Sequence, residues 1–206
     1  TYDVFDEKRY FRAGDASNII SLEESGKVLK IGLTICEDMW VNEFIQGVKL
    51  SGPDPIKKLM PENLDLLVNL SASPFSKTKK NSRELLSKEA VSRLGCPIIY
   101  LNQVGGNDEL IFDGSSFILN KKASVICNLK SCEEEFAIWN TEDNEKIINT
   151  RITSPQEDIF RALVLGVKDY AKKCEFESTI VGLSGGIDSA LVAIIAAAAL
   201  GPDKIT

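Results

Sequence analysis

Histidine is absent from the 206 residues of this chain. Its absence excludes a Ser-His-Asp or Cys-His catalytic group and any metal site with a histidine ligand, unless another chain supplies the imidazole. A nucleophile in this protein therefore has to be activated by other residue types.

Long apolar runs and an excess of positive charge are also missing. The longest apolar run, Ala190–Leu200, is shorter than the roughly 18–20 residues that a membrane-spanning helix needs. The chain has 30 acidic and 24 basic residues, a net charge of −6, which argues against a nucleic-acid partner and against a membrane partner. No signal-peptide pattern is present, so we expect a cytoplasmic protein whose five cysteines are reduced.

The remaining composition, 44% hydrophobic and 26% charged, is typical of a globular protein. The chain begins at Thr1 without a methionine, and it ends at Asp203–Thr206, which has the pattern of a new strand. We therefore expect it to be a piece of a longer protein.

Apolar segments with strand and helix patterns alternate along the first part of the chain. The β-branched run Val28–Ile35 predicts a buried strand, and the polar segment Cys36–Trp40 follows it at the strand end where sites of layered α/β folds collect. Asn81–Leu94 has apolar residues at helical spacing, and Gly95 and Pro97 then predict the end of a helix. Further strands are predicted at Leu64–Leu70, Ile98–Val104, Ser115–Leu119 and Ala123–Leu129.

A polar stretch without periodicity, Asn140–Ser154, predicts a linker between two domains. Ser154–Glu157 has the spacing of a helix N-cap with proline at the first helical position, which predicts a helix to about Lys173. A strand at Ser178–Leu183, a glycine turn and a helix at Asp188–Leu200 follow. We therefore divide the chain into a domain at residues 1–140, a linker at 141–153 and a second domain at 154–206.

The glycine turn between this strand and this helix has the composition of a phosphate-binding loop. Glycines let ligand oxygens approach the backbone amides, and the helix N-terminus adds a positive dipole end. Ser184 and Ser189 can donate hydrogen bonds to phosphate, and Asp188 is an oxygen ligand suited to Mg²⁺. No Lys-Ser/Thr pair follows the glycines, so the loop is not a Walker A loop. The alternative is a purely structural turn.

Ser184–Ser189 resembles the pyrophosphate loop of the ATP pyrophosphatases, the adenylating enzymes that release pyrophosphate from ATP. The resemblance implies that ATP is a cofactor here, with Mg²⁺ held in part by Asp188. It assigns the ATP phosphates to Gly182, Leu183, Ser184, Gly185, Gly186, Ile187, Asp188 and Ser189.

The segment Thr34–Trp40 is similar to the nucleophile turn of the nitrilase superfamily, in the form found in glutamine-dependent NAD synthetases. Tyr2–Phe11 and Asn102–Leu110 fit the same subfamily, and with the glycine loop they make four motifs in the same order. The resemblance implies an α/β fold: the C-terminal part of an α-β-β-α nitrilase-like sandwich, followed by the start of a doubly wound parallel-sheet synthetase domain.

The resemblance implies that the Cys36 thiolate attacks the side-chain amide of glutamine, so that ammonia leaves and water hydrolyses the thioester. A lysine and a glutamate activate the thiol in this family, and the motif order places both upstream of Tyr2, outside this chain. The alternative for Cys36 is a buried, inert thiol. We read the other four cysteines, Cys96, Cys127, Cys132 and Cys174, as core residues.

Glutamine-binding positions carry over from the family to Tyr2, Ser73 and Lys79. A lysine suits the α-carboxylate of glutamine. The alternative is that Lys79 belongs to a solvated basic face formed by Lys77, Lys79, Lys80 and Arg83. Candidate supporting carboxylates are Glu7, Glu37 and Glu109.

The function implied is glutamine-dependent NAD synthesis, in which ammonia released at Cys36 amidates deamido-NAD after ATP-dependent adenylation. Glutamine, ATP and deamido-NAD are then the small-molecule partners, and the family suggests a homo-oligomer. Two alternatives remain: a nitrilase-type amidase with an appended nucleotide-binding module, and a catalytically inert piece.

Overall fold

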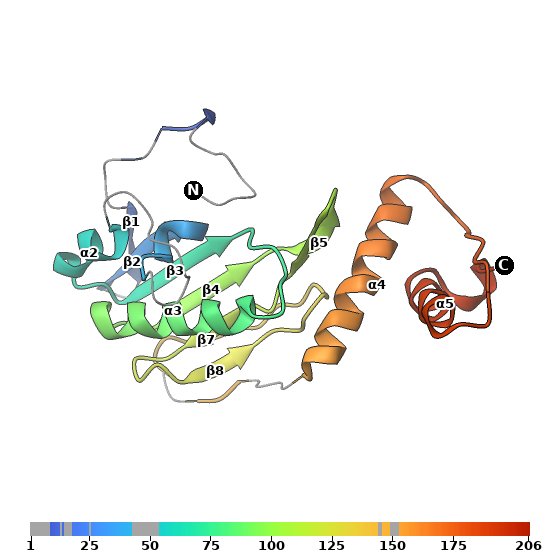
Figure 1. Cartoon of the computed structure of the whole chain (residues 1–206). Coiled ribbons are helices and arrows are strands. Elements are labelled where there is room, and N and C mark those ends of the chain that lie inside the picture. Colours follow the sequence, from blue (N-terminus) through green and yellow to red (C-terminus); the bar gives the residue numbers. More distant parts are fainter. Residues whose placement is uncertain are drawn as a thin grey trace.

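A six-stranded mixed sheet lies at the centre of the molecule, with strand order β1-β2-β3-β4-β7-β8 (Figure 1). The structure is a computed structural model, and it describes residues 9–12, 14, 18–24, 26–42, 54–143, 146–148 and 153–206. The strands of the sheet are β1 (Asn18–Glu24), β2 (Lys27–Ile35), β3 (Leu66–Ser71), β4 (Ile98–Asn102), β7 (Phe117–Leu119) and β8 (Val125–Asn128).

The three middle strands β2, β3 and β4 are parallel, so their carboxyl ends meet at one edge of the sheet. The outer pairings, β1 with β2, β4 with β7 and β7 with β8, are antiparallel. In this register Thr34 pairs with Asn69, and Asn69 pairs with Tyr100, which places one polar row across three strands. The strands predicted between residues 28 and 129 are confirmed in position, with shifts of a few residues at their ends.

Helix α3 (Lys79–Leu94) covers one face of the sheet. Leu86, Ala90 and Val91 are buried in one core with sheet residues such as Leu67 and Ile98. This confirms the helix predicted from the sequence. Gly95 ends it in the left-handed conformation, with φ +68°. The short helices η2 (Cys36–Met39), α2 (Pro55–Leu59) and η3 (Met60–Glu62) complete this layer.

The opposite face of the sheet carries apolar side chains that remain accessible. Ile35, Leu70 and Leu101 lie next to one another across β2, β3 and β4, with exposed fractions of 63%, 47% and 40%. In an α-β-β-α sandwich this is the face that a second sheet covers. The described residues thus form one helical layer and one strand layer of the predicted arrangement.

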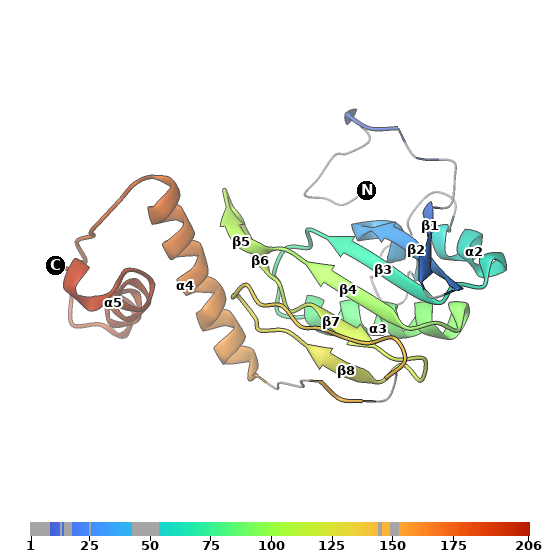
Figure 2. The ribbon, with the colours of Figure 1, turned by 180° about the vertical axis from the view of Figure 1, so that it is seen from behind.

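A hairpin of β5 (Val104–Asn107) and β6 (Leu110–Asp113) projects from the end of β4 and contacts α4 (Pro155–Lys173) (Figures 1 and 2). The strand predicted at Ile98–Val104 is divided in the structure: β4 ends at Asn102, and Val104 begins β5, which includes Gly105 and Gly106. Gly105 has φ +145°, a conformation that residues with a side chain rarely adopt, and a Cβ atom on Gly106 would make ordinary contact with α4, 3.5 Å from the Cα atom of Gly166. The Gly106 amide donates to Asp169 Oδ2 at 2.7 Å, and Lys173 Nζ donates to the Gly106 carbonyl.

The first turn of α4 has a second set of contacts with the sheet domain. Ser154 Oγ accepts from the Glu157 amide at 3.1 Å, which confirms the predicted N-cap. Lys80 of α3 forms an ion pair with Asp158 at 3.2 Å and donates to Thr153 Oγ1 at 3.1 Å. Both ends of α4 are therefore attached to the sheet domain by polar contacts.

Helix α5 (Ile187–Leu200) packs on the far side of α4 from the sheet (Figures 1 and 2). The strand predicted at 178–183 is wrong in extent, because only Thr179 forms a bridge, parallel to Ile205. A strand needs a partner along its whole length, and in the described part of the chain only Lys204–Thr206 pair with this segment. None of the helices described here has the length and apolar character needed to cross a membrane.

Replacing Asp169 with alanine is expected to loosen α4 from the hairpin. The buried Gly106 amide would lose its acceptor, and an unsatisfied buried donor costs about 1–3 kcal/mol. Hydrogen exchange of the Gly106 amide and urea unfolding measure the effect. The matched control is Asp169→Asn, which keeps an acceptor oxygen and should leave exchange close to that of the original chain. Equal exchange in both variants would contradict the assignment.

Candidate functional site

Cys36 lies directly after β2, at the edge where the three parallel strands end. Its backbone is in the left-handed region, with φ +45°, which is uncommon for a residue with a side chain. Such conformations cost about 1–3 kcal/mol and cluster at functional sites. Cys36 is partly exposed, so it is not one of the buried cysteines of this structure.

The turn that carries Cys36 is fixed on both sides. Met39 and Trp40 are buried in the core, with 2% and 7% of their surface exposed. Asp38 Oδ2 accepts from the Ile35 amide at 2.8 Å, and Asn69 Nδ2 donates to the Cys36 carbonyl at 3.4 Å. The conformation of Cys36 is thus held by its neighbours rather than by its own preference.

Tyr100, on β4, is the end member of the polar row Thr34–Asn69–Tyr100. Burial raises the pKa of Tyr100, the nearby Arg83 charge and the hydroxyls of Ser71 and Ser73 lower it, and the Cys36 charge raises it further. Neither serine reaches hydrogen-bond geometry, so the Tyr100 hydroxyl is buried without a partner among the residues the structure describes. A buried hydroxyl of this kind is unusual in a folded protein.

Ser73 lies in the loop after β3 and is 2% exposed. Its amide donates to Asn102 Oδ1 at 2.8 Å, and Asn102 Nδ2 donates to its carbonyl at 3.2 Å. Arg83 Nε donates to Ser73 Oγ at 3.1 Å. Ser73 is therefore held rigidly at the carboxyl ends of β3 and β4.

Lys79 begins α3 and is partly buried, with its Nζ 5.7 Å from the centroid of the Trp40 ring. Burial lowers the pKa of Lys79 from 10.5 to about 8; the Arg83 charge lowers it as well, and the Asp113 charge raises it. A partly buried ammonium group facing an aromatic ring can bind a carboxylate more strongly than a fully solvated lysine does.

The basic face that the sequence left as an alternative does not exist as a single solvated surface. Arg83 is 1% exposed and bound to Asp113, Lys80 is paired with Asp158, and Lys79 is partly buried. Only Lys77 is exposed as that interpretation required.

The structure therefore brings three of the predicted residues, Cys36, Ser73 and Lys79, to one edge of the sheet. Tyr2 and the candidate Glu7 lie outside the described residues. Glu37 lies in the same turn as Cys36, whereas Glu109 is exposed at the tip of the β5–β6 hairpin.

Sequence reasoning missed several polar residues that support this edge. Polar side chains at alternate positions near strand ends were the available signal, because alternate residues of a strand share one face. The missed residues are Asn69, Tyr100, Asn102 and Asp113, together with Arg83 in its buried role.

The other cysteines only partly follow the prediction that they are core residues. All five cysteines are free. Cys96 and Cys127 are buried and Cys132 is partly buried, and burial raises the pKa of the Cys96 and Cys132 thiols to about 11. Cys174 is exposed, so the prediction is wrong there, because this residue follows the last turn of α4.

The glycine loop lies beyond α4 from the sheet, so it forms a second site rather than part of the first (Figure 1). Gly185 has φ +84°, and Gly186 precedes the first turn of α5. The hydroxyls of Ser184 and Ser189 lie 3.1 Å apart, and Ser189 Oγ also donates to the Gly186 carbonyl. The loop residues are exposed or partly exposed, and their hydroxyls converge at the helix N-terminus.

A nucleotide phosphate fits this loop. Nothing lies within 4 Å of the positions that a Cβ atom would take on Gly182 and Gly185, so the backbone there is open to a ligand. Asp188 is exposed in the first turn of α5. The described residues contain no group of three or more potential metal-binding side chains, so Asp188 would share Mg²⁺ with phosphate oxygens and water.

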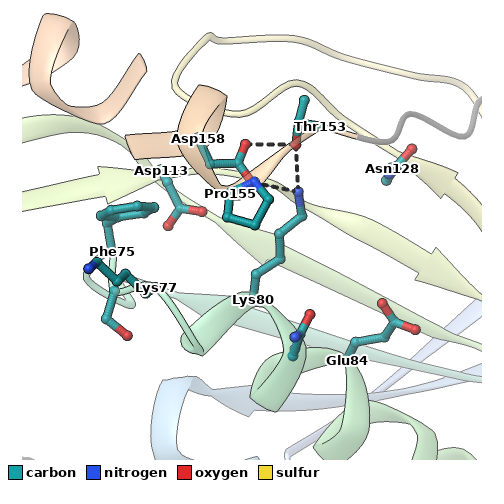
Figure 3. Close-up of a pocket in the computed structure, with 11 residues that line it drawn as sticks. Phe75, Lys77, Lys80, Glu84, Asp113, Asn128, Thr153, Pro155 and Asp158 are labelled. Atoms are coloured by element: carbon teal, nitrogen blue, oxygen red, sulfur yellow. Dashed lines mark hydrogen bonds and ion pairs between the residues drawn. The ribbon is translucent and has the colours of Figure 1, made fainter. Parts of the chain in front are cut away.

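A pocket of about 250 Å³ lies between the sheet domain and the start of α4 (Figure 3). Lys80 and Asp158 line it side by side, joined by their ion pair, and Asp113 also lines it. The pocket thus adjoins the contacts that attach α4 to the sheet domain.

Two family matches cover nearly the whole chain. Residues 2–141 match the carbon–nitrogen hydrolase family. The chain belongs to this family. Residues 159–206 match the NAD synthase family. The two matches follow one another in the order that the motifs predicted.

Curated relatives confirm the resemblance to glutamine-dependent NAD synthetases. The chain is 43% identical to the glutamine-dependent NAD(+) synthetase of Synechocystis sp., over 100% of this chain and 37% of that protein. It is 38% identical to the enzyme of the same name from Rhodobacter capsulatus, over 98% of this chain and 35% of that protein. The chain thus spans little more than a third of the length of these relatives.

Solved structures confirm the fold class. The glutamine-dependent NAD+ synthetase of Acinetobacter baumannii, solved in complex with ADP, superposes with a TM-score of 0.84 at 33% identity, over 100% of this chain and 37% of that one. A carbon–nitrogen hydrolase from Helicobacter pylori G27 shares the fold, with a TM-score of 0.51 at 24% identity, over 65% of this chain and 46% of that one.

The lowered pKa of Lys79 predicts that its amine loses its charge as the pH rises through about 8. In the unfolded chain burial is removed, so the same amine should stay charged to about pH 10.5. Labelling with an acylating reagent across pH, read at the Lys79 peptide by mass spectrometry, checks this. Labelling in urea is the control, and identical profiles with and without urea would contradict the prediction.

Proposed function

We propose that this chain takes part in glutamine-dependent NAD synthesis, with glutamine hydrolysis at Cys36 and nucleotide binding at Gly182–Ser189. The observation that carries the proposal is the pairing of two features on one chain. One is a partly exposed cysteine held in a strained turn at the end of β2, and the other is an open Ser-Gly-Gly loop at the start of α5.

At the first site, the Cys36 thiolate attacks the side-chain carbonyl carbon of glutamine. The carbon–nitrogen bond then breaks, ammonia leaves, and water hydrolyses the thioester to glutamate. The position of the thiol at the meeting point of three strand ends supports this role, since it is accessible while its backbone is fixed. The family resemblance assigns the activation of the thiol to a lysine and a glutamate that are not among these residues.

We assign the amino-acid end of glutamine to Tyr2, Ser73 and Lys79. The Lys79 ammonium would face the α-carboxylate, and the Ser73 hydroxyl would donate a hydrogen bond to it. The support is geometric, because Arg83 contacts Ser73 directly and acts on Lys79 through its charge. The assignment of Tyr2 to glutamine binding rests on the family resemblance alone.

At the second site, ATP bound with Mg²⁺ would supply the activation of the deamido-NAD carboxylate by adenylation, with release of pyrophosphate. The residues that would hold the phosphates are Gly182, Leu183, Ser184, Gly185, Gly186, Ile187, Asp188 and Ser189, with Asp188 also facing Mg²⁺. The open backbone at Gly182 and Gly185 supports this assignment, as does the ADP bound to the Acinetobacter baumannii relative.

The domain division is part of the same proposal: residues 1–140, a linker at 141–153 and 154–206. The family matches at 2–141 and 159–206 support these boundaries. Deamido-NAD as the ammonia acceptor, a homo-oligomer and a cytoplasmic location stay predictions.

Substitutions test the proposed functions of Cys36 and of the glycine loop separately. They are made in the protein encoded by the complete reading frame that contains this chain. Cys36→Ser should lower glutamine-dependent NAD formation by roughly 10³-fold or more, as removal of a catalytic nucleophile does. NAD formation from added ammonia should persist, because ammonia bypasses the thiol. Asp188→Asn should lower both activities.

Cys174→Ser is the matched control, since this exposed cysteine lies outside both sites and its loss should change neither activity. Equal loss of both activities in Cys36→Ser would contradict the assignment of Cys36 to ammonia production. Ammonia release from glutamine without any ATP-dependent NAD formation would instead identify an amidase with an appended nucleotide-binding module.

The isolated chain of 206 residues is expected to release no ammonia from glutamine, because the family's lysine and glutamate are not among its residues. An enzyme-coupled ammonia assay with the purified chain checks this. The protein from the complete reading frame is the positive control, and measurable turnover by the isolated chain would overturn the expectation.

A further inference from the structure

Arg83 has the largest side chain among the residues that are almost fully buried in the described part of the chain, with 1% of its surface exposed. It lies in the second turn of α3, close to Lys79 and facing the loop after β3. A charged side chain is buried at a high cost in free energy unless hydrogen bonds and an opposite charge compensate for it. The contacts of Arg83 therefore show which residues compensate for the burial of its charge.

The guanidinium group makes five hydrogen bonds, and all three of its nitrogens donate. Nη1 donates to both carboxylate oxygens of Asp113, at 2.9 and 3.1 Å. Nη2 donates to the carbonyls of Ser73 and Pro74, at 2.7 and 3.1 Å, and Nε donates to Ser73 Oγ at 3.1 Å. Three of the five bonds go to two adjacent residues of one loop, so the group fixes this loop as well as the ion pair.

These contacts determine the orientation of the Ser73 hydroxyl. Its oxygen accepts from Arg83 Nε, so its own proton points away from the guanidinium group. The Ser73 backbone is held from the other side by Asn102. A hydroxyl fixed in this way is a prepared donor for an anionic group, and Arg83 is the residue that prepares it.

Arg83 also acts, through its charge, on two other residues at this edge. Its charge contributes to the environment of Lys79 and of Tyr100, and Tyr100 in turn responds to the charge of Cys36. The charged groups acting on Lys79 are Arg83 from α3 and Asp113 from β6, and they act in opposite directions. Arg83 is thus linked to both the nucleophile and the cation of the proposed glutamine site without contacting solvent.

We propose that Arg83, anchored on Asp113, is a positioning residue of the glutamine site that orients the Ser73 hydroxyl and carbonyl for the amino-acid end of the substrate. This inference rests on the proposed function. Arg83 does not touch the substrate itself; it acts through Ser73 and, by its charge, through Lys79.

Kinetics of substituted enzyme, made from the complete reading frame, test this role. Arg83→Lys keeps a positive charge but cannot reproduce the planar fork of bonds to Ser73 and Asp113. We expect the KM for glutamine to rise by about tenfold or more, the loss of a hydrogen bond to a charged group. The kcat with saturating glutamine and the rate with added ammonia should change by less than about threefold.

The pH dependence of the KM for glutamine separates positioning from a merely structural role. The positive charge of Lys79 is lost as the pH rises through about 8, so the KM should increase above that pH. Arg83→Gln removes a charge that lowers the pKa of Lys79, so it should move this increase to higher pH. Asp113→Asn removes a charge that raises it, so it should move the increase to lower pH.

Two further variants are controls, one for misfolding and one for non-specific effects of a substitution in α3. The pair Arg83→Met with Asp113→Leu removes both charges together, so no unpaired charge stays buried, and it should fold with a raised KM for glutamine. Lys88→Ala, on a partly exposed position of the same helix, should leave the KM unchanged.

A KM within twofold of the original value in both Arg83→Lys and the apolar pair would overturn the inference, as would pH shifts in the same direction for Arg83→Gln and Asp113→Asn. If the unsubstituted enzyme still hydrolyses glutamine in either case, the proposed function stays intact. If the unsubstituted enzyme releases no ammonia from glutamine, both proposals are overturned.

Discussion

The buried ion pair between Arg83 and Asp113 is the interaction on which the arrangement of the candidate site depends. Its two side chains come from α3 and from the end of β6, and both are almost completely buried, with 1% and 3% of the side-chain surface exposed. The desolvation of two charges is compensated because all three nitrogens of the guanidinium group donate hydrogen bonds, one of them to the opposite charge. The loop of Ser73 lies between these two elements and takes its conformation from them.

The same ion pair connects the candidate site to the second part of the chain. Asp113 ends the β5–β6 hairpin, and the other strand of that hairpin is bound to α4 through Gly106, Asp169 and Lys173. At its other end α4 is attached by the ion pair of Lys80 with Asp158, three positions along α3 from Arg83. The hydrolase-like sheet and the glycine loop are therefore joined by a helix with two polar attachments, one to the β5–β6 hairpin and one to α3.

The two candidate sites use the backbone in different ways. At Cys36 a residue with a side chain is held at φ +45°, and buried neighbours such as Met39 and Trp40 stabilise this conformation. At Gly185 the positive φ has no steric cost, because glycine has no Cβ atom, and the loop stays open. A fixed turn suits a nucleophile that must meet one carbonyl, and an open loop of amides suits a group of phosphate oxygens.

The sequence by itself determined the elements and the two motifs. Apolar periodicity predicted α3 and α4, β-branched runs predicted the parallel strands, and the residue types of Thr34–Trp40 and Gly182–Ser189 indicated a nucleophile turn and a phosphate loop. These features are local, so a short window of sequence contains them. Only the tertiary structure decided that Arg83 is buried, that Gly105 and Gly106 belong to a strand against α4, and that 178–183 forms no full strand. Each of these outcomes depends on partners far along the chain, such as Asp113 for Arg83 and Asp169 for Gly106. The solvation of a charge and the pairing of a strand are set by what surrounds them in space, which the order of residues does not display.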